Sequence, residues 1–133
     1  MPKFSATSES RLMTCHPDII KVMRRAIEET DFSVICGWRG PEAQLKAFET
    51  GHSDLLYPRS KHNRSKVGAG IWDKTMSDAI DIAPYPIDWK DTGRFKELAK
   101  IVLRIAEEEG VKLSWGGHWT RFVDMPHYEI RRT

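Results

Sequence analysis

The sequence predicts one α+β domain, with helices packed on one face of a small, mainly antiparallel sheet. Segments with helical periodicity and segments with strand character are mixed along the chain, without the regular alternation that a parallel sheet requires. The 133 residues suffice for a single domain with a buried core. The composition, 40% hydrophobic and 30% charged, is that of an ordinary globular protein.

Three segments have the pattern of amphipathic helices. Residues 17–27 begin with a proline, which suits a first helical position, and repeat apolar residues at helical spacing. Residues 41–50 predict a second helix, which ends at Gly51. Apolar residues over 95–106 mark the longest helix, and Gly110 is its C-terminal stop.

Four segments have the pattern of strands. Residues 32–36 are apolar and β-branched, and they stop at a glycine. Residues 78–83 predict a central strand, because they are mostly apolar and are followed by two prolines. Residues 111–115 and 126–130 predict strands near the end of the chain. Between the second helix and the central strand, we expect residues 52–76 to be irregular.

Three short pieces, far apart in the sequence, carry residues of a catalytic zinc site. They are Ser60-Lys61-His62, Ala79-Ile80-Asp81 and Asp124-Met125-Pro126-His127. Zinc in hydrolases commonly takes three N or O ligands and keeps a fourth position for water. We therefore expect His62, Asp81 and His127 to bind Zn²⁺. Asp124 is then placed to act as the general base on the water.

Neighbouring carboxylates leave alternatives open. Asp81 lies in an apolar strand, where a lone carboxylate is costly without a partner such as a metal ion. Asp78 is a rival for the same ligand position. Glu129 alternates with His127 on one strand face, so it could hydrogen-bond a ligand imidazole or replace Asp124 as the base.

The order of these motifs resembles the LAS zinc metallopeptidases (peptidase M15). Their D,D-peptidase and VanY-like branch includes phage endolysins that cut peptidoglycan peptides. That family carries Ser-x-His, Ala-x-Asp and Asp/Glu-x-x-His, and also an Arg in a Gly-x-Arg turn before a helix with a Gln, here Arg39 and Gln44. The segment Trp115-Gly116-Gly117-His118-Trp119 is similar to one that phage members place before the last ligand, and we expect His118 to be structural or substrate-facing.

The resemblance implies a hedgehog/D,D-peptidase-like fold and a zinc peptidase acting on peptidoglycan. It implies that Arg39 contacts the substrate or the developing oxyanion, for which a guanidinium is well suited. It favours the L-alanyl-D-glutamate bond, with a D-alanyl-D-alanine carboxypeptidase as the alternative. A non-catalytic zinc-binding module is a further alternative, although it would not need a carboxylate at Asp124.

The chain departs from the family in one place. The family pattern is His-x-x-Gly-x-Ala-x-Asp, whereas eighteen residues lie between His62 and Asp81 here. Residues 63–76 therefore form an inserted loop, which is polar and contains Trp72. We expect this segment to contribute little to the core, and to lie at the mouth of the site as a mobile lid.

Net charge, cysteine spacing and the N-terminal sequence limit the possible partners, redox state and location of the protein. A net charge of +2 does not indicate a nucleic-acid-binding domain, even with the basic residues of 61–66. Cys15 and Cys36 lack metal-ribbon spacing and are expected to be reduced thiols. No apolar segment suits a signal peptide or membrane span. We expect a cytoplasmic monomer that acts on the cell wall after release across the membrane.

Overall fold

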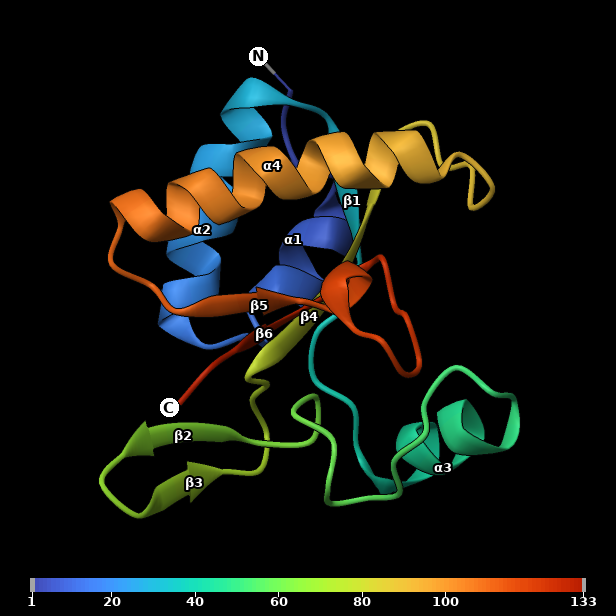
Figure 1. Ribbon diagram of the computed structural model, residues 1–133. Helices are drawn as coiled ribbons and strands as arrows, with labels where there is room; N and C mark the ends of the chain where they lie inside the picture. Colours follow the sequence, from blue (N-terminus) through green and yellow to red (C-terminus); the bar gives the residue numbers. More distant parts are fainter. Residues whose placement is uncertain (1, 133) are drawn as a thin grey trace.

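A computed structural model of the protein describes residues 2–132. Its centre is an antiparallel sheet of four strands in the order β1-β4-β6-β5 (Figure 1). The strands are β1 (Phe32–Cys36), β4 (Ala79–Pro84), β6 (His127–Ile130) and β5 (Leu113–Trp115). This sheet, together with the helices, confirms the predicted α+β class.

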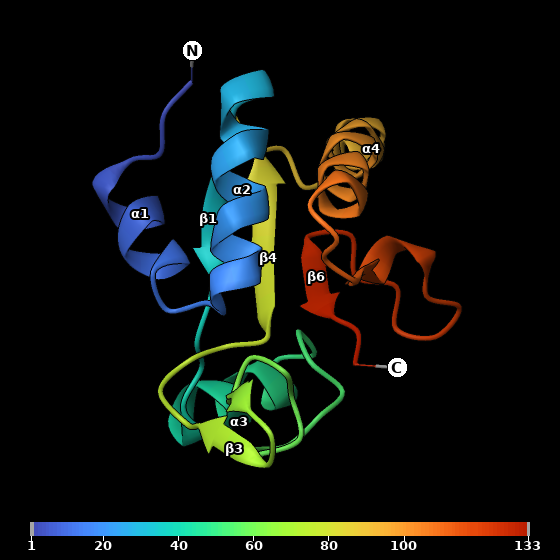
Figure 2. The ribbon, with the colours of Figure 1, turned by 90° about the vertical axis from the view of Figure 1, so that its left-hand side faces the viewer.

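Among the described residues, four α-helices accompany the sheet. They are α1 (Ala6–Leu12), α2 (Pro17–Glu29), α3 (Pro41–Glu49) and α4 (Thr92–Glu108). Two of them, α2 and α4, cover one of its faces. The helices α2 and α4 pack against each other and share one hydrophobic core with the sheet (Figure 2). Helix α1 packs on β1 and was not predicted, while α3 lies beyond one end of the sheet (Figure 1). No described helix has the length and apolarity needed to cross a membrane.

Alternation along the strands separates the core from the opposite face. Ile80 and Ile82 of β4 and Tyr128 of β6 are fully buried in the core shared with the helices. Because successive side chains of a strand point to opposite faces, Asp81 and His127 project from the other face. These two residues are also register partners across β4 and β6. The sheet therefore holds two of the predicted ligands side by side, away from its apolar core.

The expectation that residues 52–76 are irregular was wrong in part. Strands β2 (Ser65–Gly68) and β3 (Ile71–Asp73) form a separate two-stranded hairpin (Figure 1). The insertion adds none of the described hydrophobic core residues, as expected, but Asn63 and Ser65 are nevertheless completely buried. These residues are buried through hydrogen bonds rather than apolar packing, and hydrophobic periodicity does not detect that kind of burial.

A buried carboxylate anchors the base of the hairpin. Asp78 accepts a hydrogen bond from Ser65 Oγ at 2.7 Å and pairs with Arg132 Nη2 at 2.6 Å. Asp78 is almost completely buried, so these partners offset the cost of removing its charge from water. Its side chain is thus occupied at the hairpin, and Asp78 is absent from the groups of potential metal ligands among residues 2–132.

Candidate metal centre and catalytic cleft

Three of the predicted ligand atoms meet at one point. His62 Nε2 lies 3.2 Å from His127 Nδ1 and 3.3 Å from Asp81 Oδ1, and His127 Nδ1 lies 3.1 Å from Asp81 Oδ1. A tetrahedral zinc ion with bonds of about 2.0–2.1 Å separates its ligand atoms by about 3.3 Å. The nearly equilateral triangle of two nitrogens and one oxygen therefore fits a zinc ion.

Hydrogen bonds orient both imidazoles toward this point. His62 Nδ1 lies 2.7 Å from the carbonyl oxygen of Gly37, which can only accept, so Nδ1 carries the proton and Nε2 keeps its lone pair. His127 Nε2 lies 2.8 Å from Glu129 Oε1, which leaves His127 Nδ1 facing the centre. Glu129 is itself paired with Lys61 at 3.0 Å. Such outer partners fix the orientation of metal-binding histidines.

The electrostatics of the centre favour a cation. Burial lowers the pKa of His62, so this ring stays neutral. Burial would raise the pKa of Asp81, but the neighbouring imidazoles of His62 and His127 hold it well below its usual range. Burial would also lower the pKa of His127, but hydrogen bonds to Asp81 and Glu129 raise it to about 9. The carboxylates of Asp81 and Glu129 thus stabilise a positive charge at the centre of the ligand triangle.

Asp124 lies at the edge of the triangle. Its Oδ2 is 4.0 Å from His127 Nδ1, and its backbone nitrogen donates to the carbonyl of Gly116 at 3.0 Å. A side chain at position 116 would collide with the backbone of Asp124, so glycine permits this close approach. Burial and the Asp81 carboxylate raise the pKa of Asp124 to about 6. This carboxyl is close enough to act on a group at the centre, and one of its oxygens lies within 4.8 Å of potential ligand atoms of Asp81 and His127.

Arg39 reaches the same cleft from the turn between β1 and α3. Its backbone nitrogen donates to the His62 carbonyl at 2.8 Å, which joins the two segments. Its side-chain Nε is buried and has no hydrogen-bond partner among residues 2–132. A buried guanidinium nitrogen without a partner is costly, and a bound substrate group would satisfy it.

Gln44, the glutamine of the family pattern, makes its contacts within the protein. It is completely buried on α3, and its Nε2 donates to Ser53 Oγ at 2.9 Å and to the Leu55 carbonyl at 2.7 Å. Its Oε1 accepts from Asn63 Nδ2 at 3.1 Å, next to His62. Gln44 therefore ties α3 to the segment that carries the first proposed ligand.

Cys36 is closer to the centre than the sequence suggests. Its Sγ lies within 4.8 Å of potential ligand atoms of His62 and Asp81. Burial, with the Asp81 charge, raises the pKa of this thiol to about 11, so it stays protonated near neutral pH. Cys15 is fully buried, and both cysteines are free thiols, as expected.

A cleft runs over the triangle. One part, with a volume of about 150 Å³, is lined by His62, His127, Asp124, Arg39 and Glu129, together with Trp119 and Phe122. The ring of Trp119 lies 5.0 Å from that of His127. His52 and Arg59 also line this part, and no sequence pattern indicates a role for either. None of residues 63–76 lines it, so Trp72 of the insertion lies outside the cleft wall.

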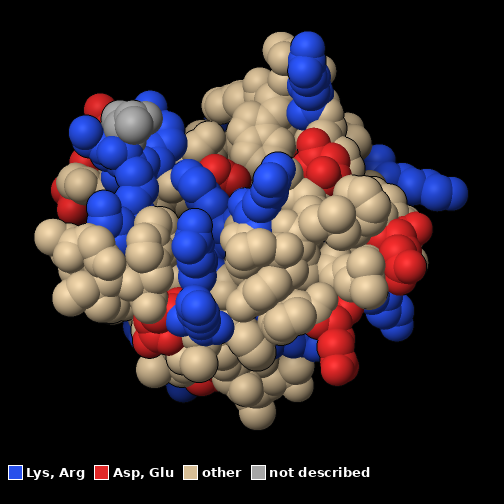
Figure 3. All heavy atoms as spheres, turned by 90° about the horizontal axis from the view of Figure 1, so that it is seen from below, with Lys and Arg blue, Asp and Glu red and all other residues tan. Residues whose placement is uncertain are grey.

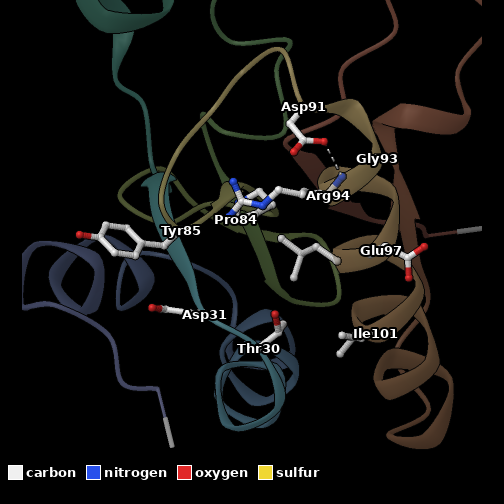
Figure 4. A pocket seen from close by; sticks show the side chains of 10 residues that line it. Thr30, Asp31, Pro84, Tyr85, Asp91, Gly93, Arg94, Glu97 and Ile101 are labelled. Atoms are coloured by element: carbon white, nitrogen blue, oxygen red, sulfur yellow. Dashed lines mark hydrogen bonds between the residues drawn. The ribbon is translucent and has the colours of Figure 1, made fainter.

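Another hollow lies away from the metal centre, between the end of α2 and the start of α4 (Figure 4). Its volume is about 430 Å³, and its lining includes Asp31, Tyr85, Arg94 and Glu97. Arg94 turns back to the protein, since its Nη1 donates to the Pro86 carbonyl at 2.6 Å. The lining residues include no histidine or cysteine and form none of the possible metal-binding groups among residues 2–132. This hollow therefore carries none of the chemistry of the metal centre.

Comparisons with known proteins point to one family. The family model described as phage L-alanyl-D-glutamate peptidase matches residues 1–133. The L-alanyl-D-glutamate peptidase of Escherichia phage T5 is 35% identical over 136 residues, covering 98% of this chain and 90% of that protein. The crystal structure of the Serratia marcescens L-Ala D-Glu endopeptidase ChiX is similar, with a TM-score of 0.77 and 29% identity. The match covers 97% of this chain and 90% of that one.

Proposed function

Because the chain belongs to the phage L-alanyl-D-glutamate peptidase family, we propose that it hydrolyses the L-alanyl-D-glutamate bond of peptidoglycan stem peptides, as a phage-type endolysin. The observation that supports hydrolysis most strongly is the meeting of His62, Asp81 and His127, with Asp124 beside them. Two imidazoles and a carboxylate are a ligand set of catalytic zinc, and the carboxyl of Asp124 supplies a base.

We propose that His62 Nε2, Asp81 Oδ1 and His127 Nδ1 hold a zinc ion. When bound, the ion supplies Lewis-acid chemistry, which acidifies a water and polarises the substrate carbonyl. Glu129 and the Gly37 carbonyl keep the two imidazoles in the correct tautomers.

Asp124 and Arg39 complete the proposed mechanism. Asp124 accepts the proton of the attacking water and then delivers it to the amine of the leaving glutamate. The Arg39 guanidinium offers hydrogen bonds to the carbonyl oxygen as negative charge develops there. Trp119 and Phe122 line the cleft beside these groups and limit the access of other water molecules.

The alternatives fit less well. A D-alanyl-D-alanine carboxypeptidase is less consistent with relatives named for the L-Ala-D-Glu bond. A non-catalytic zinc module leaves the position of Asp124 unexplained. All the proposed ligands come from one chain, so a monomer is sufficient for activity. Action on the wall would follow release of the protein across the membrane.

Digestion of purified peptidoglycan tests this function. The protein is incubated with the polymer, and the new termini are identified by mass spectrometry. We expect new N-terminal D-glutamate and new C-terminal L-alanine, and none with the Asp124→Asn variant. Release of free D-alanine instead would show a carboxypeptidase, and the absence of any new terminus with metal-loaded protein would refute the proposed peptidase.

A further inference from the structure

The cleft has two parts of different chemistry, which meet at Asp124 and His52. The part described above contains the cationic side chains Arg39, Arg59 and Lys61. The other part has a volume of about 490 Å³ and is lined by the apolar residues Ile35, Trp89 and Pro126 together with His52, Asp81 and Asp124. A peptide lying across the metal centre would therefore place its two ends in different surroundings.

Two of the three cations in the first part are available for a ligand. Lys61 is already engaged, since it pairs with Glu129 at 3.0 Å and donates to the Ile130 carbonyl at 2.6 Å. In contrast, Arg39 has a buried Nε without a partner. Arg59 is exposed at the cleft, and within residues 2–132 its side chain forms no ion pair. Lys and Arg side chains also form a band across the face at the α3 and hairpin end of the molecule, with Asp and Glu side chains around it (Figure 3).

The second part offers an exposed aromatic surface. Trp89 is 55% exposed, and one side of its ring stacks on Phe95, with the ring centroids 5.8 Å apart. The rest of the indole therefore remains accessible beside the apolar wall. Large exposed aromatic groups in a cleft are typical contact sites for substrates, because they bury much apolar area with little loss of side-chain freedom.

The proposed substrate has a matching asymmetry. The amine of the D-glutamate residue is part of the bond to be cut, and only one of its two carboxyl groups can continue the peptide. At least one carboxylate therefore remains free on the leaving side. The L-alanine side carries a methyl group and the acyl group attached to its nitrogen, and neither is charged.

We propose that the difference between the two parts of the cleft, one with free arginines and one with an exposed aromatic wall, orients the substrate. This inference rests on the function proposed above. Arg59 binds the free carboxylate of D-glutamate on the leaving side, since a guanidinium matches a carboxylate with paired hydrogen bonds. L-Alanine and its acyl substituent lie along Ile35 and Trp89. Arg59 and Trp89 are thus specificity-determining residues on opposite sides of the bond.

A comparison of two peptides tests the leaving side. One contains L-Ala-D-Glu with its free carboxylate, and in the other that carboxylate is replaced by an amide. We expect the wild-type protein to prefer the acid by about tenfold or more in kcat/KM, as for a hydrogen bond to a charged group. Arg59→Gln should bring this ratio close to one. The matched control Arg104→Gln lies in an exposed ion pair on the α2–α4 side and should keep the wild-type ratio.

The outcomes separate the two proposals. Equal cleavage of both peptides by the wild type, or an unchanged preference in Arg59→Gln, would overturn the role of Arg59 while leaving the peptidase function standing. Cleavage of neither peptide by metal-loaded wild-type protein would overturn the function itself.

The acyl side has its own test. Trp89→Ala should lower kcat/KM about tenfold for a peptide whose alanine nitrogen carries a muramoyl group, and less for a peptide with a free amine. Tyr85→Ala is the control, because Tyr85 is also an exposed aromatic residue but lines neither part of the cleft. Equal losses on both peptides in Trp89→Ala would overturn this placement of the acyl group.

Discussion

Asp124 is the residue whose removal should separate catalysis from metal binding. We expect Asp124→Asn to lower kcat by about 10²–10⁴-fold, which is the usual contribution of general acid–base catalysis. The zinc content should stay at one ion per chain, because the three proposed ligands are unchanged. Turnover is measured with a soluble stem peptide, and zinc by elemental analysis. Native turnover in this variant would place the base elsewhere, with Glu129 as the first candidate.

Glu129 should act through His127 rather than on the substrate. Its Oε1 lies 2.8 Å from His127 Nε2, so Glu129→Gln weakens the group that orients this ligand. We expect zinc affinity to fall about 10–100-fold, measured by competition with a chromophoric chelator. Glu107→Gln, an exposed change on α4, is the control. Wild-type zinc affinity in Glu129→Gln would show that the hydrogen bond does not support the metal.

The identities of the proposed site residues could be predicted from sequence, but their supporting contacts could not. His62, Asp81, His127, Asp124 and Arg39 all reach one cleft, although their roles remain to be tested. The contact of Gln44 with Asn63, the proximity of Cys36 to the centre and the place of Arg59 in the cleft wall depend on chain segments that are distant or irregular. Hydrophobic periodicity carries no information about such polar contacts.

At the scale of elements, the base of the β2–β3 hairpin should stabilise the fold. Asp78→Ala removes a buried carboxylate and leaves Ser65 and Arg132 without their partner. Since hydrogen bonds to charged groups contribute about 1.5–3 kcal/mol, we expect the free energy of unfolding to fall by about 2–3 kcal/mol. Urea denaturation measures the change.

The control for this change is Asp73→Ala on the same hairpin, whose carboxylate accepts hydrogen bonds from the backbone nitrogen and the hydroxyl of nearby Thr75. This variant should lie within about 0.5 kcal/mol of the wild type. Equal stability of Asp78→Ala and the wild type would show that the hairpin base is not part of the framework.

The predicted elements are those with strong local signals. Helices α2 and α4 carry long apolar stripes, and β1 and β4 are apolar runs ended by glycine or proline. Helix α1 is seven residues long and buries only Ser8 and Leu12, so its amphipathic pattern is too short to identify. The hairpin strands are similarly short and largely exposed, and their position depends on the distant pair Asp78 and Arg132.

For the whole molecule, stability and chemistry occupy opposite faces of one sheet. Ile80 and Ile82 are buried under α2 and α4, while Asp81 between them points to the cleft. The apolar core can therefore form without a metal ion. The metal centre nevertheless joins three segments that are separate in the chain, because His62 precedes the hairpin while Asp81 and His127 lie on different strands.

An ion bound by these three segments should stabilise the folded state, since the unfolded chain does not hold them together. A ligand present at 1,000 times its dissociation constant stabilises by about 4 kcal/mol. For a domain of this size, that corresponds to a rise in Tm of roughly ten degrees or more. We expect zinc to produce this rise in metal-stripped protein, measured by scanning calorimetry, and a chelator to reverse it.

The His127→Ala variant makes this measurement specific to the proposed centre. It removes one ligand on β6 and keeps the remaining acidic and histidine side chains, so any effect of zinc on other parts of the surface persists. The zinc-dependent rise in Tm should be absent or much smaller in this variant, while Asp124→Asn should retain it. An equal rise in His127→Ala and in the wild type would show that zinc stabilises the protein from another position, and the three-segment centre would then be wrong.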